Sequence, residues 1–235
     1  AGINYSSAEN DARDHIIAND GDEETAMTLV ERQLAMIDKQ VKPGAAIYMC
    51  HDIRYTADLR EVLDKAQYHI GDVLIWKKNT ASTWLSDYAK FYEPIFYGWR
   101  KGAPRVWYGK GMQPNTIELQ KLDSLTEVQL RNLLKKIITN YMEIKKETRR
   151  LFELHPTLKP VRLIQQHIAN STNAGDIIFD GFAGSGSTII AAESLKRKCR
   201  AMEIEPKFCD IAVRRWQEET DDQAFNDESG EPFGE

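Results

Sequence analysis

A glycine-rich turn at residues 180–188 contains residue types that could bind a small charged ligand. The segment Asp180-Gly-Phe-Ala-Gly-Ser-Gly-Ser-Thr188 follows the apolar run from Ile177 to Phe179 and precedes a second apolar stretch. Glycine has no Cβ, so the backbone can turn sharply there and approach a ligand closely. A helix that begins near Ser187 would direct its unpaired N–H groups at the same point. The pattern predicts a buried parallel strand, a ligand-binding turn and a helix in succession.

Three ligand classes, and a turn that binds nothing, are the alternatives for this loop. A phosphate-binding NTPase loop requires a lysine after its second glycine, and Ser187 stands at that position. A dinucleotide fingerprint requires a third glycine, and Ile189 occupies that place. S-adenosylmethionine carries a sulfonium and a free amino group instead of a polyphosphate, so the acidic Asp180 suits it better than a lysine would. We therefore favour S-adenosylmethionine.

A second predicted strand ends in carboxylates downstream of the loop, in the segment Cys199-Arg-Ala-Met-Glu-Ile-Glu-Pro206. Doubly wound α/β folds place the acid that accepts two ribose hydroxyls about twenty residues after the glycine loop. Glu203 is the candidate for that acid. Pro206 suits the first turn of a helix, and the residues from Phe208 to Trp216 have the spacing of a packed helical face.

Strand and helix patterns alternate along the rest of the chain. Helices are expected over 22–39 and 56–67, and a mostly helical stretch over 125–150. Strands are expected over 45–50, 73–76 and 94–99. Strand, helix and strand without long gaps indicate an α/β fold with a parallel sheet wrapped by helices. His51 and Asp52 end the first of these strands, where a structural or substrate-lining role is favoured over catalysis.

Three motifs together closely resemble the beta class of amino-group DNA methyltransferases, which methylate adenine N6 or cytosine N4. Phage and prophage members are especially similar. The motifs are His155-Pro-Thr-Leu-Lys-Pro160, the 180–188 loop and Met202-Glu-Ile-Glu-Pro206. Weaker agreement at Ile75–Asn79 and Tyr88–Gly98 extends the likeness over most of residues 1–220. The resemblance implies a doubly wound, mostly parallel Rossmann-like methyltransferase sheet with a basic target-recognition insertion.

The resemblance also implies S-adenosylmethionine as cofactor and no metal. It places the glycine loop beside the methionine part of the cofactor and Glu203 on its ribose, and it has residues 155–160 close over the cofactor from the other side. The implied cofactor-binding residues are Asp180, Phe182, Ala183, Gly184, Ser185, Gly186, Thr188, Glu203, His155, Thr157, Lys159 and Pro160.

The catalytic tetrapeptide of this class, Asp/Asn/Ser-Pro-Pro-Tyr/Phe/Trp, does not occur among the 235 residues, because none of the eight prolines are adjacent. Its polar groups accept the protons of the exocyclic amine, and its aromatic ring stacks on the flipped base. In the class it directly precedes a segment like Gly2-Ile-Asn-Tyr5, so we expect it just before Ala1 in the parent polypeptide. A gene remnant or an inactive fragment is the alternative. The catalytic residues are therefore unknown within the chain.

The formal net charge of −5 is unevenly distributed. Seven basic residues outnumber two acidic ones between residues 77 and 110, and do so again between 131 and 150, whereas acids dominate after Arg215. The first basic segment is also rich in aromatics, which suits an unstacked base and its flanking phosphates. Core packing of the aromatics and a solvated basic face are the alternatives. The DNA-binding candidates are Lys77, Lys78, Asn79, Arg100, Lys101 and Lys110.

These observations predict four segments. Residues 1–99 form the N-terminally truncated catalytic half, and 100–153 form the target-recognition insertion, for which a partner-binding helix is the alternative. Residues 154–220 form the cofactor-binding half, and 221–235 form an acidic mobile tail. The predicted function is that of a site-specific DNA methyltransferase of the restriction–modification type, acting on N6 of a flipped adenine in double-stranded DNA. Cytosine N4 methylation and an inactive cofactor- or DNA-binding remnant are the alternatives.

Composition excludes several other classes. There is no apolar run long enough to span a membrane and no signal peptide, so a soluble, cytoplasmic protein of a bacterium or phage-infected host is expected. Three cysteines without a C-x-x-C pair argue against a disulfide framework and a zinc site. No proline precedes a cysteine, which excludes methylation of cytosine carbon. The oligomeric state is left open.

Overall fold

The computed structural model describes residues 23–78, 91–109, 111–113, 115–118 and 158–234. The chain divides into two compact units. We call the first the glycine-loop unit, whose described residues are 23–30, 158–168 and 173–234, and the second the mixed-sheet unit, which holds the described residues between 31 and 118 together with 169–172. The helix expected over 125–150, and with it most of the predicted target-recognition insertion, lies outside the described residues.

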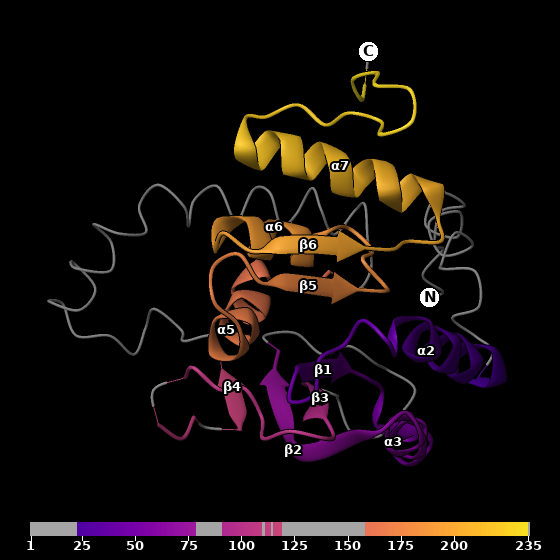
Figure 1. Ribbon diagram of the computed structural model, residues 1–235, viewed down its shortest axis with the longest axis vertical. Coiled ribbons are helices and arrows are strands. Elements are labelled where there is room, and N and C mark those ends of the chain that lie inside the picture. The colour runs from indigo at the N-terminus through magenta and orange to yellow at the C-terminus, as the bar shows by residue number, and fades with distance from the viewer. Residues whose placement is uncertain (1–22, 79–90, 110, 114, 119–157, 235) are drawn as a thin grey trace, which may run out of the picture. The chain divides into compact units, whose positions relative to one another are not determined.

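A four-stranded sheet with the strand order β1-β3-β2-β4 forms the centre of the mixed-sheet unit (Figure 1). Strand β3 runs antiparallel to both β1 and β2, and β4 runs parallel to β2. The strands are β1 (Ala46–Cys50), β2 (Tyr68–Lys77), β3 (Tyr92–Arg100) and β4 (Thr116–Glu118). The three strands predicted here are confirmed, although β2 begins five residues before the predicted position 73.

The expected pairing of these strands is wrong in one respect. β1 and β2 run in the same direction, as a strand–helix–strand unit requires, but β3 lies between them and pairs with both. A strand that returns after β2 can bond to two parallel strands at once, and the sequence pattern of either strand is unchanged by which neighbour it has. The α/β class is therefore right, but the described part of this sheet is mixed, and the mostly parallel, doubly wound sheet is not confirmed.

Helices cover the buried residues of this sheet. Helix α3 (Thr56–Lys65) contacts β2 and buries Leu59, Val62 and Leu63, while Ile95 and Phe96 of β3 are fully buried. Helix α2 (Glu23–Ile37) contributes Leu34 to the buried set. The core alternative is thus correct for Phe96, whereas Phe91 is 47% exposed.

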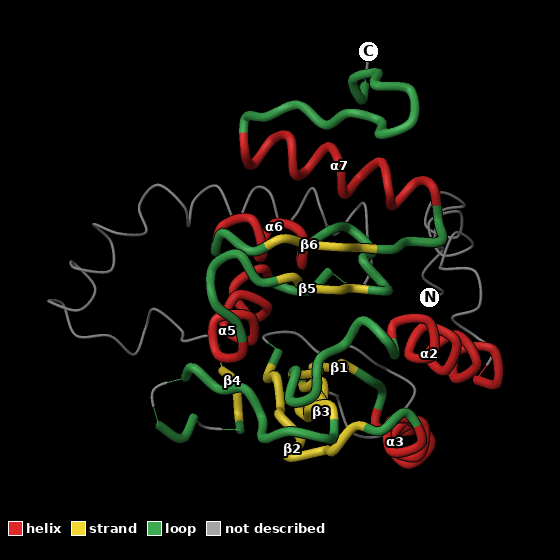
Figure 2. Tube along the Cα trace, viewed as in Figure 1, coloured by secondary structure: helices red, strands yellow, loops and turns green. Residues whose placement is uncertain are grey.

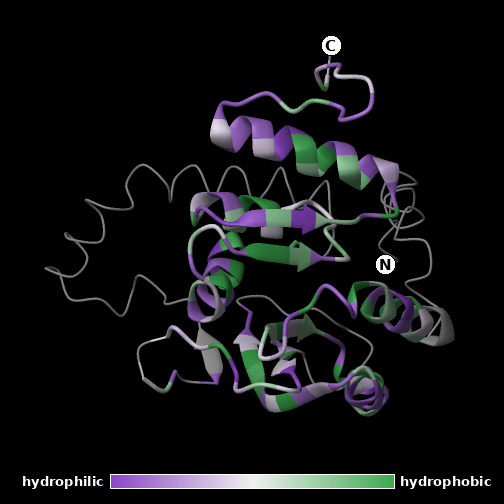
Figure 3. Ribbon diagram, viewed as in Figure 1, coloured by the Kyte–Doolittle hydropathy of each residue, from purple (hydrophilic) through white to green (hydrophobic). Residues whose placement is uncertain are grey.

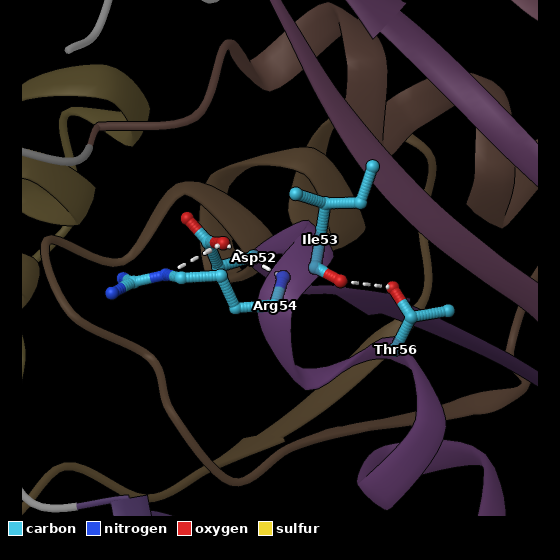
Figure 4. Close-up of polar contacts among 4 residues, drawn as sticks. All are labelled: Asp52, Ile53, Arg54 and Thr56. Carbon is cyan, nitrogen blue, oxygen red and sulfur yellow. Dashed lines mark hydrogen bonds and ion pairs between the residues drawn. The ribbon is translucent and has the colours of Figure 1, made fainter. Parts of the chain in front are cut away.

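Asp52 and His51 make structural contacts, and the substrate-lining role that the sequence also allows stays a prediction. The Asp52 carboxylate accepts hydrogen bonds from the backbone N and the side-chain Nε of Arg54, at 3.0 and 3.1 Å, and caps the short 3-10 helix η1 (Ile53–Tyr55). Thr56 Oγ1 donates to the carbonyl of Ile53 at 2.8 Å and continues this turn into α3 (Figure 4). His51 stacks on Phe96, with ring centroids 4.3 Å apart.

The glycine-loop unit contains a parallel pair of strands, β5 (Ile177–Asp180) and β6 (Lys198–Ala201). Its helices are α5 (Val161–Ser171), α6 (Ser187–Ser194) and α7 (Pro206–Thr220), which Figure 2 shows in red. Hydrophobic residues make up most of β5 (Figure 3), so the predicted succession of strand, turn and helix is confirmed. Burial of the strand is not confirmed: Ile177 is 66% exposed, whereas Ile178 on the opposite side of β5 packs against the helices.

Small side chains allow the helices of this unit to pack closely. Ala191 and Ala192 of α6 are fully buried against Ile168 of α5. Ile178 of β5 and Cys199 of β6 pack against the same cluster. Burial raises the pKa of the Cys199 thiol to about 12, so this cysteine acts as a small apolar residue. All three cysteines are free thiols.

The acidic C-terminal segment has a defined conformation between residues 221 and 234. Phe225 and Pro232 form a β-bridge, and Gln223 Nε2 donates to the carbonyl of Phe233 at 2.9 Å and to Gln217 Oε1 of α7 at 3.0 Å. The guanidinium of Arg214 lies 5.9 Å from the ring centroid of Phe233. The segment therefore folds back on α7, and its predicted mobility stays a prediction.

Because the side chain of His167 in α5 is buried, we expect the stability of the fold to depend on pH. The side chain is 8% exposed, and burial lowers its pKa from 6.5 to about 4. The unfolded chain binds a proton near pH 6.5 and the folded chain only near pH 4, so stability is greatest above pH 6.5 and falls as the pH decreases toward 4. The wild type should lose free energy of unfolding between about pH 7 and about pH 4.5, and His167→Gln should make that loss smaller by about 2–3 kcal/mol.

Urea unfolding of the wild type and the variant at both pH values checks this expectation. His69→Gln is the matched control, because His69 is an exposed residue of β2. Equal pH dependence in His167→Gln and the wild type would assign the effect to other groups.

Among the described residues, no helix combines the length and the apolar character that crossing a membrane requires. In the same part of the chain, no three His, Cys, Asp or Glu side chains gather where they could hold a metal ion.

Candidate cofactor site

The glycine loop is tied to the end of β6 by backbone hydrogen bonds. The N–H of Met202 donates to the carbonyl of Asp180 at 2.8 Å, and the N–H of Ala183 donates to the carbonyl of Met202 at 3.0 Å. Asp180 Oδ1 accepts from the N–H of Phe182 at 2.9 Å. Gly184 and Gly186 have φ angles of 52° and 80°, values that side chains disfavour. The loop thus has a defined shape in which its glycines are required.

The Glu203 carboxylate links the glycine loop to the backbone that follows β6. Its Oε2 accepts a hydrogen bond from the N–H of Gly184 at 2.7 Å, and its Oε1 accepts from the N–H groups of Ile204 and Glu205 at 2.9 and 3.0 Å. A carboxylate offers about four lone-pair sites, so Oε2 retains capacity for a further donor such as a hydroxyl. The predicted proximity of Glu203 to the glycine loop is therefore correct.

Helix α7 packs against the loop at Gly186. A Cβ on Gly186 would lie 2.8 Å from Ala212 Cβ, well inside van der Waals contact. Three residues further along the same face of α7, Arg215 donates hydrogen bonds to the carbonyl of Ser185 and, at 3.5 Å, to Ser187 Oγ. Arg215 is 9% exposed. The start of α6 is therefore held in place by a buried guanidinium.

The structure brings together eight of the twelve predicted cofactor residues. Lys159 and Pro160 are described in the segment before α5, and their closure over a cofactor stays a prediction. His155 and Thr157 lie outside the described residues. The eight that gather at the ends of β5 and β6 and at the start of α6 are Asp180, Phe182, Ala183, Gly184, Ser185, Gly186, Thr188 and Glu203.

Sequence reasoning missed Ala212 and Arg215 as parts of the site. The sequence pattern places both only on the packed face of the last helix. A signal was present, because Arg215 is a charged residue on a stripe that otherwise carries apolar residues such as Phe208. A charge at a buried position requires hydrogen-bonding partners, and the sequence alone does not identify them.

Three of the six predicted DNA-binding residues, Lys78, Arg100 and Lys101, pair with acids of the mixed-sheet unit. Lys78 forms an ion pair with Glu93. The Arg100 guanidinium lies 2.5 Å from Asp38 Oδ1 and donates to the carbonyl of Ala66 at 2.5 Å.

Lys101 pairs with Asp64 at 2.6 Å, in a bond that lowers the pKa of the Asp64 carboxyl. Lys77 is an exposed residue at the end of β2. Asn79 and Lys110 lie outside the described residues. DNA contact by this set stays a prediction.

An apolar pocket of about 310 Å³ lies in the mixed-sheet unit. It is lined by Ile53, Thr56, Val73, Ile75, Tyr92 and Pro94. Among the described residues, this lining has no acid or base that could recognise the charged groups of S-adenosylmethionine, so the candidate cofactor site remains at the glycine loop.

Comparison with known proteins identifies the family. The model of the N6/N4 DNA methylase family matches residues 6–214, which include the glycine loop, Glu203 and most of α7. This chain belongs to the DNA methylase family. The match ends at Arg214, so the acidic C-terminal segment lies beyond the matched residues.

Curated relatives of this DNA methylase are aligned over parts of their length. The orphan methyltransferase M.BamHII of Bacillus amyloliquefaciens is 28% identical over 169 residues, which are 63% of this chain and 62% of the relative. The DNA adenine methyltransferase YhdJ of Escherichia coli is 41% identical over 64 residues, which are 27% of this chain and 22% of the relative. The chain thus spans less than two thirds of the length of these relatives.

Solved structures of DNA methyltransferases share the α/β fold of this methylase. The complex of M1.HpyAVI with S-adenosylmethionine (SAM) superposes with a TM-score of 0.58 at 21% identity, over 79% of this chain and 81% of that one. The PvuII DNA methyltransferase, which is cytosine-N4-specific, superposes with a TM-score of 0.59 at 15% identity, over 86% of this chain and 74% of that one. At these identities the likeness concerns the fold alone.

Proposed function

We propose that this DNA methylase binds S-adenosylmethionine at the glycine loop and methylates the exocyclic N6 of a flipped adenine in double-stranded DNA. The observation that carries the proposal is the hydrogen bond from the N–H of Gly184 to Glu203 Oε2 at 2.7 Å, which places a carboxylate directly against the glycine loop. Membership in the N6/N4 family supports it. So does the fold shared with a structure that holds S-adenosylmethionine.

Each group at the site has a chemical role in this proposal. Glu203 Oε2 accepts a hydrogen bond from the ribose, and a second hydroxyl competes with the N–H of Gly184 for the same carboxylate. The Phe182 side chain, which is part of the loop and 53% exposed, offers an apolar surface for the cofactor. The bound cofactor supplies an electrophilic methyl group. The chain's own residues hold and orient that group, and this positioning by itself contributes to the rate.

Adenine is the proposed base because the relative with 41% identity is an adenine methyltransferase. Cytosine N4 is the alternative, favoured by the fold shared with the PvuII enzyme. A catalytically inactive remnant that binds cofactor or DNA is the second alternative, since no Pro-Pro tetrapeptide occurs among these residues.

Transfer of a labelled methyl group to duplex DNA, followed by mass spectrometry of the nucleosides, tests the function. The assay uses the full translated product that contains these residues. N6-methyladenine is the expected product. N4-methylcytosine would replace the proposal with its first alternative, and cofactor binding without transfer would favour the remnant.

DNA binding by the basic residues has its own test. If Lys77 and Lys101 each contact a phosphate, the slope of log affinity against log salt should become shallower by about 0.9 in Lys77→Gln and in Lys101→Gln. The matched control is Lys65→Gln, on the exposed side of α3, where the lysine pairs with Glu61 at 2.7 Å. Filter binding over a range of salt concentrations measures the slopes. If both variants keep the wild-type slope, DNA binds elsewhere.

A further inference from the structure

Arg215 is a buried cation of α7 that donates hydrogen bonds to the glycine loop. Its Nη1 donates to the carbonyl of Ser185 and to Ser187 Oγ, the residues on either side of Gly186. Ala212, one helical turn earlier on α7, contacts Gly186 so closely that no Cβ fits there. The loop therefore lies directly against α7 at Gly186, and the guanidinium bonds to it on both sides of that glycine.

This arrangement determines which backbone groups face a ligand. The carbonyl of Ser185 is directed at Arg215. The first hydrogen bond within α6 runs from the N–H of Ile190 to the carbonyl of Gly186 at 3.2 Å. The N–H groups of Ser187, Thr188 and Ile189 precede that bond and have no acceptor within the helix. An anion is favoured at such a helix start, and a guanidinium beneath it strengthens the preference.

The two ends of the site thus differ in charge. Glu203 places a carboxylate at Gly184, whereas Arg215 places a cation at Ser185 and at Ser187, the first residue of α6. S-adenosylmethionine has a matching asymmetry, because its only anionic group is the carboxylate of its methionine part, while its ribose offers hydroxyl donors. The two charged residues would therefore act on different parts of one ligand.

We propose that Arg215 is a positioning residue that gives the site its affinity for the methionine carboxylate, by holding Ser185 and Ser187 so that the start of α6 faces that group. The proposal rests on the proposed function, since it assigns one end of the same cofactor. It separates Arg215 from Glu203, which acts on the ribose.

Two ligands that share the same adenosine test the assignment by calorimetry. S-adenosylmethionine has the methionine carboxylate, and 5′-methylthioadenosine lacks the amino acid part altogether. Arg215→Met should lower the affinity for S-adenosylmethionine by roughly tenfold or more and leave that for methylthioadenosine within about twofold. Arg215→Lys, which keeps the charge but loses the planar fork, should lose less. Glu203→Ala should weaken both ligands.

Arg214→Met is the matched control, because this neighbouring arginine faces Phe233 of the C-terminal turn. It should bind both ligands as the wild type does. Ser187→Ala removes an acceptor of Arg215 without burying an altered charge, and it serves if Arg215→Met fails to fold by circular dichroism. The Ser187→Ala variant should then have a lower affinity for S-adenosylmethionine and an unchanged affinity for methylthioadenosine.

Equal losses for the two ligands, or no loss for either, would overturn the assignment of Arg215. Failure of the wild type to bind S-adenosylmethionine would instead overturn the proposed function, so the two failures are distinguishable.

Discussion

Replacing Glu203 with alanine is expected to lower the affinity for S-adenosylmethionine by roughly two to four orders of magnitude. The variant loses two charge-assisted hydrogen bonds to the ribose, each of about 1.5–3 kcal/mol. It also removes the acceptor of three backbone N–H groups, those of Gly184, Ile204 and Glu205. Calorimetric titration of the cofactor into wild type and variant measures the loss.

Two further variants separate the ribose contact from the support of the loop. Glu203→Gln keeps one oxygen acceptor but no charge, so its affinity should lie between those of wild type and alanine variant. Glu218→Ala removes an exposed acid of α7 and should leave the affinity unchanged. Wild-type affinity in a folded Glu203→Ala variant would remove this residue from the ribose site.

Gly186→Ala is expected to destabilise the chain by about 2–5 kcal/mol. An alanine at a φ of +80° has a left-handed backbone, which costs about 1–2 kcal/mol. Its Cβ would also lie 2.8 Å from Ala212 Cβ, and overpacking of this kind costs about 1–3 kcal/mol. Urea unfolding monitored by circular dichroism gives the change in free energy of unfolding.

The chain offers a matched control for each part of this effect. Gly175 has a φ of +85° and open space around its Cβ position, so Gly175→Ala should show the backbone cost alone. Adding Ala212→Gly to Gly186→Ala removes the Cβ contact and should restore part of the stability, despite the cost of about 1 kcal/mol for glycine in a helix. Equal destabilisation by Gly186→Ala and Gly175→Ala would mean that the loop can move away from α7.

The two glycines also link stability to cofactor binding. Gly186 precedes the first residue of α6, whose N–H groups face the cofactor in the role proposed for Arg215. A shift of this loop therefore alters the candidate site, whereas Gly175 lies in the turn before β5. The cofactor affinity should accordingly fall in Gly186→Ala and stay near that of the wild type in Gly175→Ala.

Local patterns in the sequence determined the elements of the candidate site. The apolar run before Asp180, the glycines after it and the carboxylate at Glu203 predicted β5, the loop, α6 and the end of β6, because strand period, turn chemistry and helix capping depend on neighbouring residues. Family motifs within the chain carried the assignment to the N6/N4 DNA methylases, which the family match to residues 6–214 establishes.

Contacts between distant residues were decided only by the tertiary structure. The position of β3 between β1 and β2 is a choice of pairing partner, which the alternation of one strand does not encode. Arg100 looked like a phosphate ligand, yet its guanidinium pairs with Asp38, 62 positions away. Arg215 looked like part of a packed helix face, yet it bonds to Ser185 across 30 positions. The residue type of a charged side chain does not reveal whether it contacts solvent, DNA or a buried carbonyl. Its partner is decided by how the chain folds.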